Sequence, residues 1–157
     1  MDDVVLRRAR PDEMDALTAL CLRSKASNGY DEAFMAACVE ELTVRPQWFE
    51  RSEFWLAEKR GRIVGCARLT PDDPGTAEIE TFFVEPEFRS TGVGRRLWEH
   101  LKGRARERGL ARLHLEADPY AEPVYERFGF RTVGRAASGS IPGRTLPRME
   151  MILEETK

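Results

Sequence analysis

The chain has 157 residues, of which 41% are hydrophobic and 33% are charged. This length predicts a single domain, residues 1–157, that buries about 70% of the surface of its unfolded chain, and the composition excludes a disordered polypeptide. The net charge of −2 gives no basic field for binding nucleic acid, and the apolar runs are too short for a transmembrane helix.

The number and spacing of the cysteines and histidines indicate the cellular compartment and bear on metal binding. The three cysteines are widely spaced in apolar segments: Cys21, Cys38 and Cys66. Their odd number favours reduced thiols and a cytoplasmic protein, and the charged residues 1–8 lack the apolar core of a signal peptide. Because His100 and His114 are the only histidines and no Cys-x-x-Cys pair occurs, no metal site is predicted.

Hydrophobic periodicity and turn residues predict alternating strands and helices. In chain order these are a strand (4–8), a helix (11–27), a helix (31–45), three strands (54–58, 62–69, 76–85), a helix ending at Gly109, a strand (111–116), a short helix (119–128) and two strands (130–133, 148–153). Three consecutive strands predict an antiparallel meander, and the later strand–helix–strand unit predicts a parallel crossover. The expected fold class is therefore α/β, a mixed sheet with helices on both faces.

The most informative segment follows the long strand and reads FFVEPEFRSTGVGRRL from Phe82. Gly92 and Gly94 lack a Cβ, so the backbone there can turn sharply and approach a ligand closely. The first N–H groups of the following helix have no intrahelical partner and carry partial positive charge. Since Arg89 and Arg95 bracket these groups, the segment predicts a cradle for a phosphate or pyrophosphate.

These residues resemble the GCN5-related N-acetyltransferase (GNAT) superfamily of acetyl-CoA-dependent acyltransferases. Arg89–Gly94 is similar to the family signature Gln/Arg-x-x-Gly-x-Gly/Ala, and Ala121–Phe130 is similar to the family segment Ala-x-x-(Phe)-Tyr-x-x-x-Gly-Phe. The order of elements agrees over nearly the whole chain. The resemblance implies a mostly antiparallel sheet of six to seven strands flanked by about four helices.

The resemblance also implies acetyl-CoA as co-substrate, without a metal. The coenzyme A pyrophosphate would bind the N–H groups of residues 89–95, and the pantetheine amides would pair with the end of the long strand, which must then be splayed from its neighbour. A backbone N–H there could bind the thioester oxygen. The predicted cofactor-binding residues are Phe82, Phe83, Val84, Arg89, Ser90, Thr91, Gly92, Val93, Gly94, Arg95 and Tyr120. Tyr120 stands where many family members have asparagine.

The family implies direct attack on the thioester by a primary amine of a small molecule or peptide. The amine arrives protonated, so a base is required. Alternation along the long strand places Glu78 and Glu80 on the face of Phe82 and Val84. Glu78 lies where some members have the base and Glu80 is a second candidate, although either could be an exposed strand carboxylate. Tyr125 occupies the position that protonates the leaving thiolate; otherwise it packs on the sheet.

Two other classes of function remain open. Gly92 and Gly94 form part of a Gly-x-Gly-x-x-Gly fingerprint with Glu116 downstream, which favours a dinucleotide-binding oxidoreductase. Against it, Leu97 stands at the third glycine position and seven residues, 85–91, separate the strand from the first glycine. A non-catalytic acetyl-CoA-binding regulatory module would keep the fold without turnover.

The acceptor amine is less clearly indicated. Glu32, Glu40 and Glu41, with the strand carboxylates, could favour a cationic amine. Residues 140–147 resemble one bacterial subgroup and are expected to help wall the acceptor site. Homodimerisation is compatible with the sequence but is not required by it.

Overall fold

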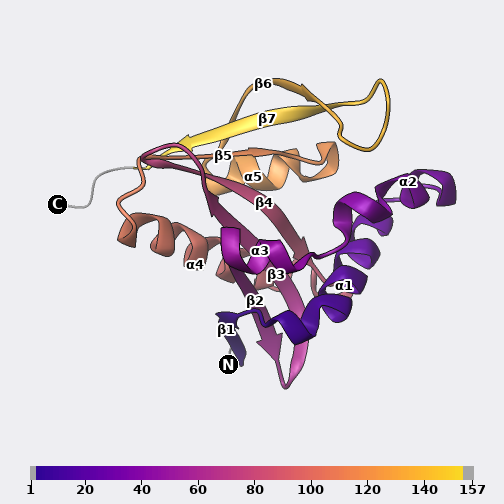
Figure 1. Ribbon diagram of the computed structural model, residues 1–157, viewed down its shortest axis with the longest axis horizontal. Coiled ribbons are helices and arrows are strands. Elements are labelled where there is room, and N and C mark those ends of the chain that lie inside the picture. The colour runs from indigo at the N-terminus through magenta and orange to yellow at the C-terminus, as the bar shows by residue number, and fades with distance from the viewer. Residues whose placement is uncertain (1–2, 154–157) are drawn as a thin grey trace.

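The computed structural model describes residues 3–153 and shows one sheet with helices on both faces (Figure 1). The strands are β1 (Val4–Arg8), β2 (Glu53–Lys59), β3 (Arg62–Pro71), β4 (Thr76–Val84), β5 (Arg112–Glu116), β6 (Arg131–Ala137) and β7 (Thr145–Ile152). The helices are α1 (Met14–Ala26), α2 (Glu32–Leu42), α3 (Pro46–Arg51), α4 (Val93–Glu107) and α5 (Glu122–Phe128). The predicted mixed α/β class is confirmed. The ends of the predicted domain, 1–2 and 154–157, lie outside the described residues.

The sheet has seven strands in the order β1-β2-β3-β4-β5-β7-β6. Neighbouring strands are antiparallel except β4 and β5, which α4 connects as a parallel crossover. The predicted meander and crossover are therefore both present. Within residues 3–153 no helix is long and apolar enough to cross a membrane.

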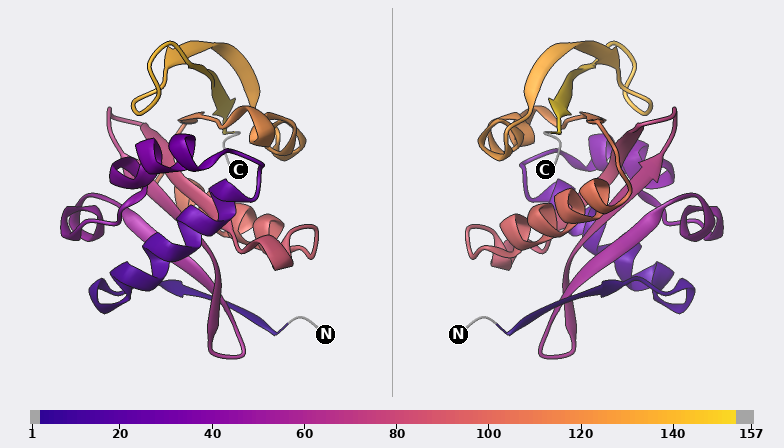
Figure 2. Two further views of the ribbon diagram at one scale, coloured as in Figure 1. Left: turned by 90° about the vertical axis from the view of Figure 1, so that its right-hand side faces the viewer. Right: turned by 90° about the vertical axis from the view of Figure 1, so that its left-hand side faces the viewer.

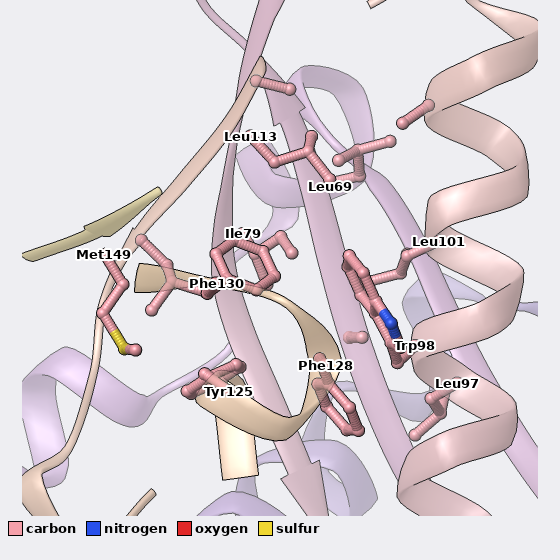
Figure 3. Packing of buried hydrophobic residues seen from close by; sticks show 14 of the residues in the cluster. Leu69, Ile79, Leu97, Trp98, Leu101, Leu113, Tyr125, Phe128, Phe130 and Met149 are labelled. Carbon is pink, nitrogen blue, oxygen red and sulfur yellow. The ribbon is translucent and has the colours of Figure 1, made fainter. Parts of the chain in front are cut away.

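Each face of the sheet has its own hydrophobic core, with α4 on one face and α1 to α3 on the other (Figure 2). On the α4 face, Trp98 stacks on Phe128 with ring centroids 5.5 Å apart and meets Phe130 edge-on (Figure 3). On the opposite face, Leu17 and Leu20 of α1 pack against strands β2 and β3. The period of apolar residues in α1 and α4 explains this arrangement, because each helix buries a single stripe.

Strands β4 and β5 separate soon after they meet. Their pairing covers only Thr76 to Glu78 of β4 against Arg112 to His114 of β5, and Figure 1 shows the two strands moving apart beyond this point. β4 continues to Val84 with β3 as its partner on the other side. The predicted splay of the long strand is confirmed.

An irregularity in β4 changes which side chains share a face. Thr81 pairs with Arg68, whereas Ile79 pairs with Leu69, so Glu80 is an extra residue without a partner on β3. Such a β-bulge inserts one residue and reverses the alternation of the side chains that follow.

The bulge corrects one prediction. Ile79 and Phe82 both pack in the core under α4, as does Val84, although strict alternation would place Ile79 and Phe82 on opposite faces. Glu78, next to Ile79, therefore lies on the face opposite to Phe82. The prediction that Glu78 and Glu80 share the face of Phe82 and Val84 is wrong, because the bulge intervenes.

Three element boundaries also differ from the prediction. Pro46 was expected to end the second helix, but it begins a further helix, α3, whose first turn tolerates a residue without an N–H. Strand β6 continues to Ala137 and β7 begins at Thr145, so the last hairpin is longer than the sequence pattern predicted. Residues 3–153 accordingly contain five α-helices, where the resemblance implies about four.

A buried carboxylate ties β2 to the end of α4. Glu53 is 5% exposed and accepts hydrogen bonds from Arg104 at 2.8 Å and Arg108 at 2.8 Å. Burial disfavours its charged form, but the donors from Arg104, Trp55 and Arg108 outweigh this effect and lower the pKa of Glu53 to about 2. The ion pair thus stabilises the packing of α4 on the sheet.

We expect Glu53→Gln to lower the free energy of unfolding by about 2 kcal/mol, which corresponds to about 4–8 °C in Tm. The loss is smaller than for a fully buried pair because the arginines reach solvent. Since the folded-state pKa of about 2 lies below the ordinary 4.5, the contribution exists above about pH 4.5 and is lost as pH falls towards 2. The difference in Tm between the two proteins should therefore narrow in acid.

Glu107→Gln is the matched control, because Glu107 also pairs with Arg104 but is 66% exposed. Its removal should change the stability by less than about 0.5 kcal/mol. Equal losses for the two variants in thermal unfolding would contradict the role given to Glu53.

Candidate active site

A cavity of about 850 Å³ lies along the separated end of β4, between the start of α4, α5 and the α1–α3 side of the sheet. This volume is in the range of small-molecule sites. Twelve of the predicted site residues line it: Glu78, Glu80, Phe82, Phe83, Val84, Arg89, Ser90, Gly92, Gly94, Arg95, Tyr120 and Tyr125. Thr91 and Val93 do not line it. The Thr91 hydroxyl donates to the Phe88 carbonyl, and Val93 is 2% exposed in the core, so only their backbone could take part.

The glycine corner between β4 and α4 has the backbone conformation of an anion cradle. Gly92 caps α4 with φ +96°, and Ser90 is also left-handed with φ +62°. No side chain caps the first turn of α4. Its N–H groups therefore remain available to a ligand, and the helix dipole favours a negative charge there.

The two predicted arginines of the corner have different partners. Arg89 donates to the Ser24 carbonyl at 2.7 Å and to Asn28 Oδ1 at 3.2 Å, which fastens the corner to α1. Arg95 lies over the Phe128 ring, 5.1 Å from its centroid, and pairs with the exposed Glu99. A structural role for Arg89 is thus established, and cofactor binding by either arginine stays a prediction.

The end of β4 offers one free edge to the cavity. Phe82, Phe83 and Val84 pair with β3 on one side, but β5 has already left on the other. Backbone N–H and C=O groups on this edge need partners. An extended chain with amide groups can supply them as an added strand.

Tyr125 of α5 reaches this edge from the side of the aromatic core. It is 8% exposed and meets the Phe82 ring edge-on. It also meets Phe128 and Phe130 edge-on, and Tyr125, Phe128 and Phe130 are all labelled in Figure 3. Its hydroxyl has no hydrogen-bond partner among residues 3–153. Burial, with a smaller effect from the Asp118 charge, raises the pKa of Tyr125 well above its usual value. The hydroxyl is therefore protonated at neutral pH and able to donate.

The two candidate bases have different surroundings. Glu80 pairs with Arg68 at 3.2 Å and with Arg51 at 3.4 Å, so its carboxylate oxygens are engaged by two guanidinium groups. Glu78 is half-buried, and its carboxylate has no hydrogen bond or ion pair within the part of the chain that the structure describes. Burial, and then the nearby charge of Glu80, raises the pKa of Glu78. Of the two candidates, Glu78 accordingly has the surroundings that suit a base better, and its catalytic role stays a prediction.

The structure adds a polar cluster that the sequence analysis missed. Asp118, directly after β5, accepts from the Tyr30 hydroxyl at 2.9 Å and from Lys25 at 3.3 Å. Arg144 of the β6–β7 loop donates to the Tyr30 oxygen at 2.6 Å. Burial raises the pKa of Asp118, but the donors from the Tyr120 N–H, Tyr30 and Lys25 hold it below its usual value. The signal for Asp118 was its place at the carboxyl end of a parallel strand.

A second residue missed is Arg68, which lies in the cavity wall and is only 3% exposed. Its guanidinium lies 3.7 Å from the centroid of the Trp48 ring and also donates to Thr81 at 2.9 Å. A charged residue within the apolar run of β3 was the available signal, because an arginine is seldom buried unless it is paired.

Of the glutamates predicted to favour a cationic acceptor, one lines the cavity and two do not. Glu41 lines the cavity, whereas Glu32 and Glu40 do not. Residues 140–147 were expected to help wall the acceptor site, and Leu146 of this segment lines the cavity. Gly139, which directly precedes the segment, lines it as well.

The sequence matches the family model described as "Acetyltransferase (GNAT) family" over residues 22–130. The chain belongs to this family. A doubly wound parallel sheet, which the dinucleotide fingerprint requires, is not found in residues 3–153, since β4–β5 is the parallel pair of this GNAT sheet. The oxidoreductase interpretation therefore lacks its structural context.

Related sequences and structures agree with the GNAT assignment. The chain is 35% identical over 85 residues to an IAA acetyltransferase of Azospirillum brasilense, which is 52% of this chain and 56% of that protein. It is 36% identical over 103 residues to a mycothiol acetyltransferase of Thermobispora bispora, or 59% of this chain and 35% of that protein. The chain thus spans about half or less of these relatives.

Among solved structures, a GCN5-related N-acetyltransferase from Rhodopseudomonas palustris matches with TM-score 0.80 and 22% identity, covering 98% of both chains. The PaiA N-acetyltransferase of Thermoplasma acidophilum, solved in complex with coenzyme A, matches with TM-score 0.77 and 17% identity, covering 96% of this chain and 99% of that one. At these identities the likeness concerns the fold.

Proposed function

We propose that the protein is an acetyl-CoA-dependent N-acetyltransferase that moves an acetyl group directly to a primary amine of a small molecule or peptide. The observation that carries this proposal is the single cavity that joins an uncapped helix N-terminus, a free strand edge, a half-buried carboxylate and a buried tyrosine. Family membership supports the same chemistry.

Coenzyme A fits the cofactor end of this cavity. Its pyrophosphate would bind the N–H groups between Arg89 and Arg95, where Gly92 and Gly94 let the backbone approach closely. Its pantetheine amides would pair with the free edge of Phe82 to Val84. A backbone N–H of this edge would then stabilise the oxyanion of the reacting thioester.

The proposed reaction uses Glu78 and Tyr125. Glu78, directly or through a water molecule, takes a proton from the acceptor ammonium, and the free amine attacks the thioester carbonyl. The C–N bond forms, the C–S bond breaks, and Tyr125 protonates the leaving thiolate. One proton is released to solvent in each turnover, because the substrate enters as an ammonium ion and leaves as a neutral amide.

The acceptor end of the cavity favours a cationic amine. Three carboxylates line it without an ion pair among residues 3–153: Glu41, Glu78 and Glu116. The other acids there, Glu80 and Asp118, are paired with cationic side chains. The unpaired carboxylates would attract a substrate that carries positive charge beyond its reacting ammonium.

We expect acetyl-CoA, but neither NAD nor ATP at the same concentration, to raise Tm. A ligand at a hundredfold excess over its Kd stabilises by about 2.7 kcal/mol, which is about 5–11 °C for a domain of this size. A shift with NAD alone would contradict the acetyltransferase proposal, and no shift with any ligand would contradict the proposed cofactor site.

Substitutions at two glycines of α4 test, in the same experiment, where the cofactor binds. A Cβ at Gly94 would meet Val84 at an ordinary 3.6 Å, so Gly94→Ala should fold, but the methyl group enters the cavity and should weaken the shift with acetyl-CoA. Gly103→Ala is the matched control, since a Cβ there meets nothing within 4 Å and Gly103 is not among the cavity residues. Its shift should equal that of the unmodified protein.

Tyr125→Phe should lower kcat by about 10- to 100-fold with little change in KM for acetyl-CoA. The loss lies at the low end for general acids because a thiolate, with a thiol pKa near 8.5, is already a fair leaving group. The check is release of free coenzyme A over a panel of amines, with the thermal shift by acetyl-CoA as the folding control. An unchanged kcat would contradict the acid role. If the unmodified protein binds acetyl-CoA but acetylates no amine, the regulatory module is favoured instead.

Glu78→Gln should lower kcat at neutral pH by about 100-fold. Activity should rise with pH through the raised pKa of Glu78 in the parent, because the protonated carboxyl cannot accept a proton. The variant should recover at high pH, where the amine arrives unprotonated. Glu80→Gln, compared in the same assay, should mainly lower Tm, because Arg68 loses its charged partner. A larger loss of kcat in Glu80→Gln than in Glu78→Gln would reverse the assignment.

A further inference from the structure

Glu78 borders two cavities. Besides the cavity of about 850 Å³, it lines a second cavity of about 240 Å³ together with His114. Carboxylates and cations of β5 and β7 complete the polar part of this second wall: Glu116, Arg148 and Glu150. The proposed base therefore borders a second cavity, and a histidine lies in the wall of that cavity.

His114 is placed there by the sheet register. It is the partner of Glu78 in the last pair before β4 and β5 separate. Its Nε2 lies 2.6 Å from Oδ2 of Asp72 in the β3–β4 turn, and their side chains are 35% and 37% exposed. One oxygen of Glu78, one ring nitrogen of His114 and one oxygen of Asp72 all lie within 4.8 Å of one another.

We propose that His114, held in place by Asp72, carries to solvent the proton that Glu78 removes from the acceptor ammonium. This inference rests on the proposed function and adds positioning residues for its proton transfer. Asp72 is itself fixed in the turn, since it accepts from the Thr76 hydroxyl and from the Asp73 N–H. The ring of His114 is thereby held in one orientation.

The proposed proton transfer returns Glu78 and His114 to their starting protonation states. Proton removal leaves a neutral amine and a protonated Glu78, which must be ionised again before the next ammonium can be accepted. With Nε2–H donating to Asp72, Nδ1 of His114 is free to take that proton, through one water molecule or a small side-chain rotation. The imidazolium is stabilised by the carboxylate of Asp72 and then gives its proton to solvent, so that Glu78 and His114 return to their starting states.

The charged groups around His114 favour transfer of the proton from Glu78 to the imidazole ring. Glu78 lies beside it on β4, Glu150 opposite it on β7, and Glu116 follows on β5. Arg148 of β7 also lines the cavity, and Glu150 is paired with Arg112 and Arg131. Asp72, whose Oδ2 lies 2.6 Å from the ring, is the carboxylate that pairs with a transient imidazolium.

The test compares His114→Gln and Asp72→Asn with the parent enzyme, in EDTA so that no divalent metal occupies the three groups. We expect kcat at neutral pH to fall by about tenfold or more in His114→Gln, and less in Asp72→Asn, with KM for acetyl-CoA unchanged. The deficit should disappear at high pH, where no proton has to leave. Added imidazole should restore activity to His114→Ala.

The control and the double variant separate this pathway from a purely structural ion pair. Glu150→Gln removes a carboxylate that Arg112 and Arg131 already neutralise, so this variant should keep the parent pH profile. In the background of Glu78→Gln, the change His114→Gln should cost no further kcat, because the pathway has lost its source.

The outcomes distinguish this inference from the function on which it rests. Loss of kcat in Glu78→Gln with the parent pH profile in His114→Gln would overturn the exit pathway alone. Full activity in Glu78→Gln would overturn the base assignment, and with it the pathway. A fall in Tm of His114→Gln without any change in the pH profile would show that His114 and Asp72 serve only the turn.

Discussion

The site depends on the separation of β4 from β5 after their third residue pair. β4 keeps its bonds to β3, so the strand stays extended, while its other edge is left with N–H and C=O groups that need partners. An exposed edge of this kind is ordinarily a liability in a sheet. Here the edge faces a cavity, and the aromatic side chains of Tyr125 and Phe128 pack on Phe82 from α5. The feature that weakens the sheet thus creates room for an added chain.

The bulge at Glu80 decides the electrostatics on the same strand. By adding one residue, it lets Ile79 and Phe82 share a core while the two carboxylates remain on the other side with α3. Arg68 and Arg51 then neutralise Glu80. Glu78 has no cationic partner among residues 3–153, and burial beside the negative charge of Glu80 raises its pKa. Two glutamates separated by one residue are in this way given different chemistry by their surroundings.

The sequence was most informative where the signal is local. Gly92 and Gly94 mark the corner because a left-handed cap and a close approach need residues without a side chain, and the crossover through α4 follows from the order of elements. The bulge was not predictable in this way, because it depends on the register in which β4 pairs with β3. An alternation of side chains without a bulge therefore predicted the wrong face for Glu78. α3 was missed because Pro46 is equally typical of a helix end and a helix start.

The polar cluster at Asp118 was missed for a different reason, because its members come from three distant segments. α1 connects it to the rest of the site. Arg23 of α1 clamps Glu85 just after β4, at 2.7 and 2.8 Å, and Lys25 holds Asp118 just after β5. Arg23 and Lys25, which lie two residues apart on α1, thereby hold the segments that follow the two separated strands. The C-terminal end of α1 thus contacts the segments that follow both separated strands, so the same element positions the free edge of β4 and the Asp118 side of the cavity.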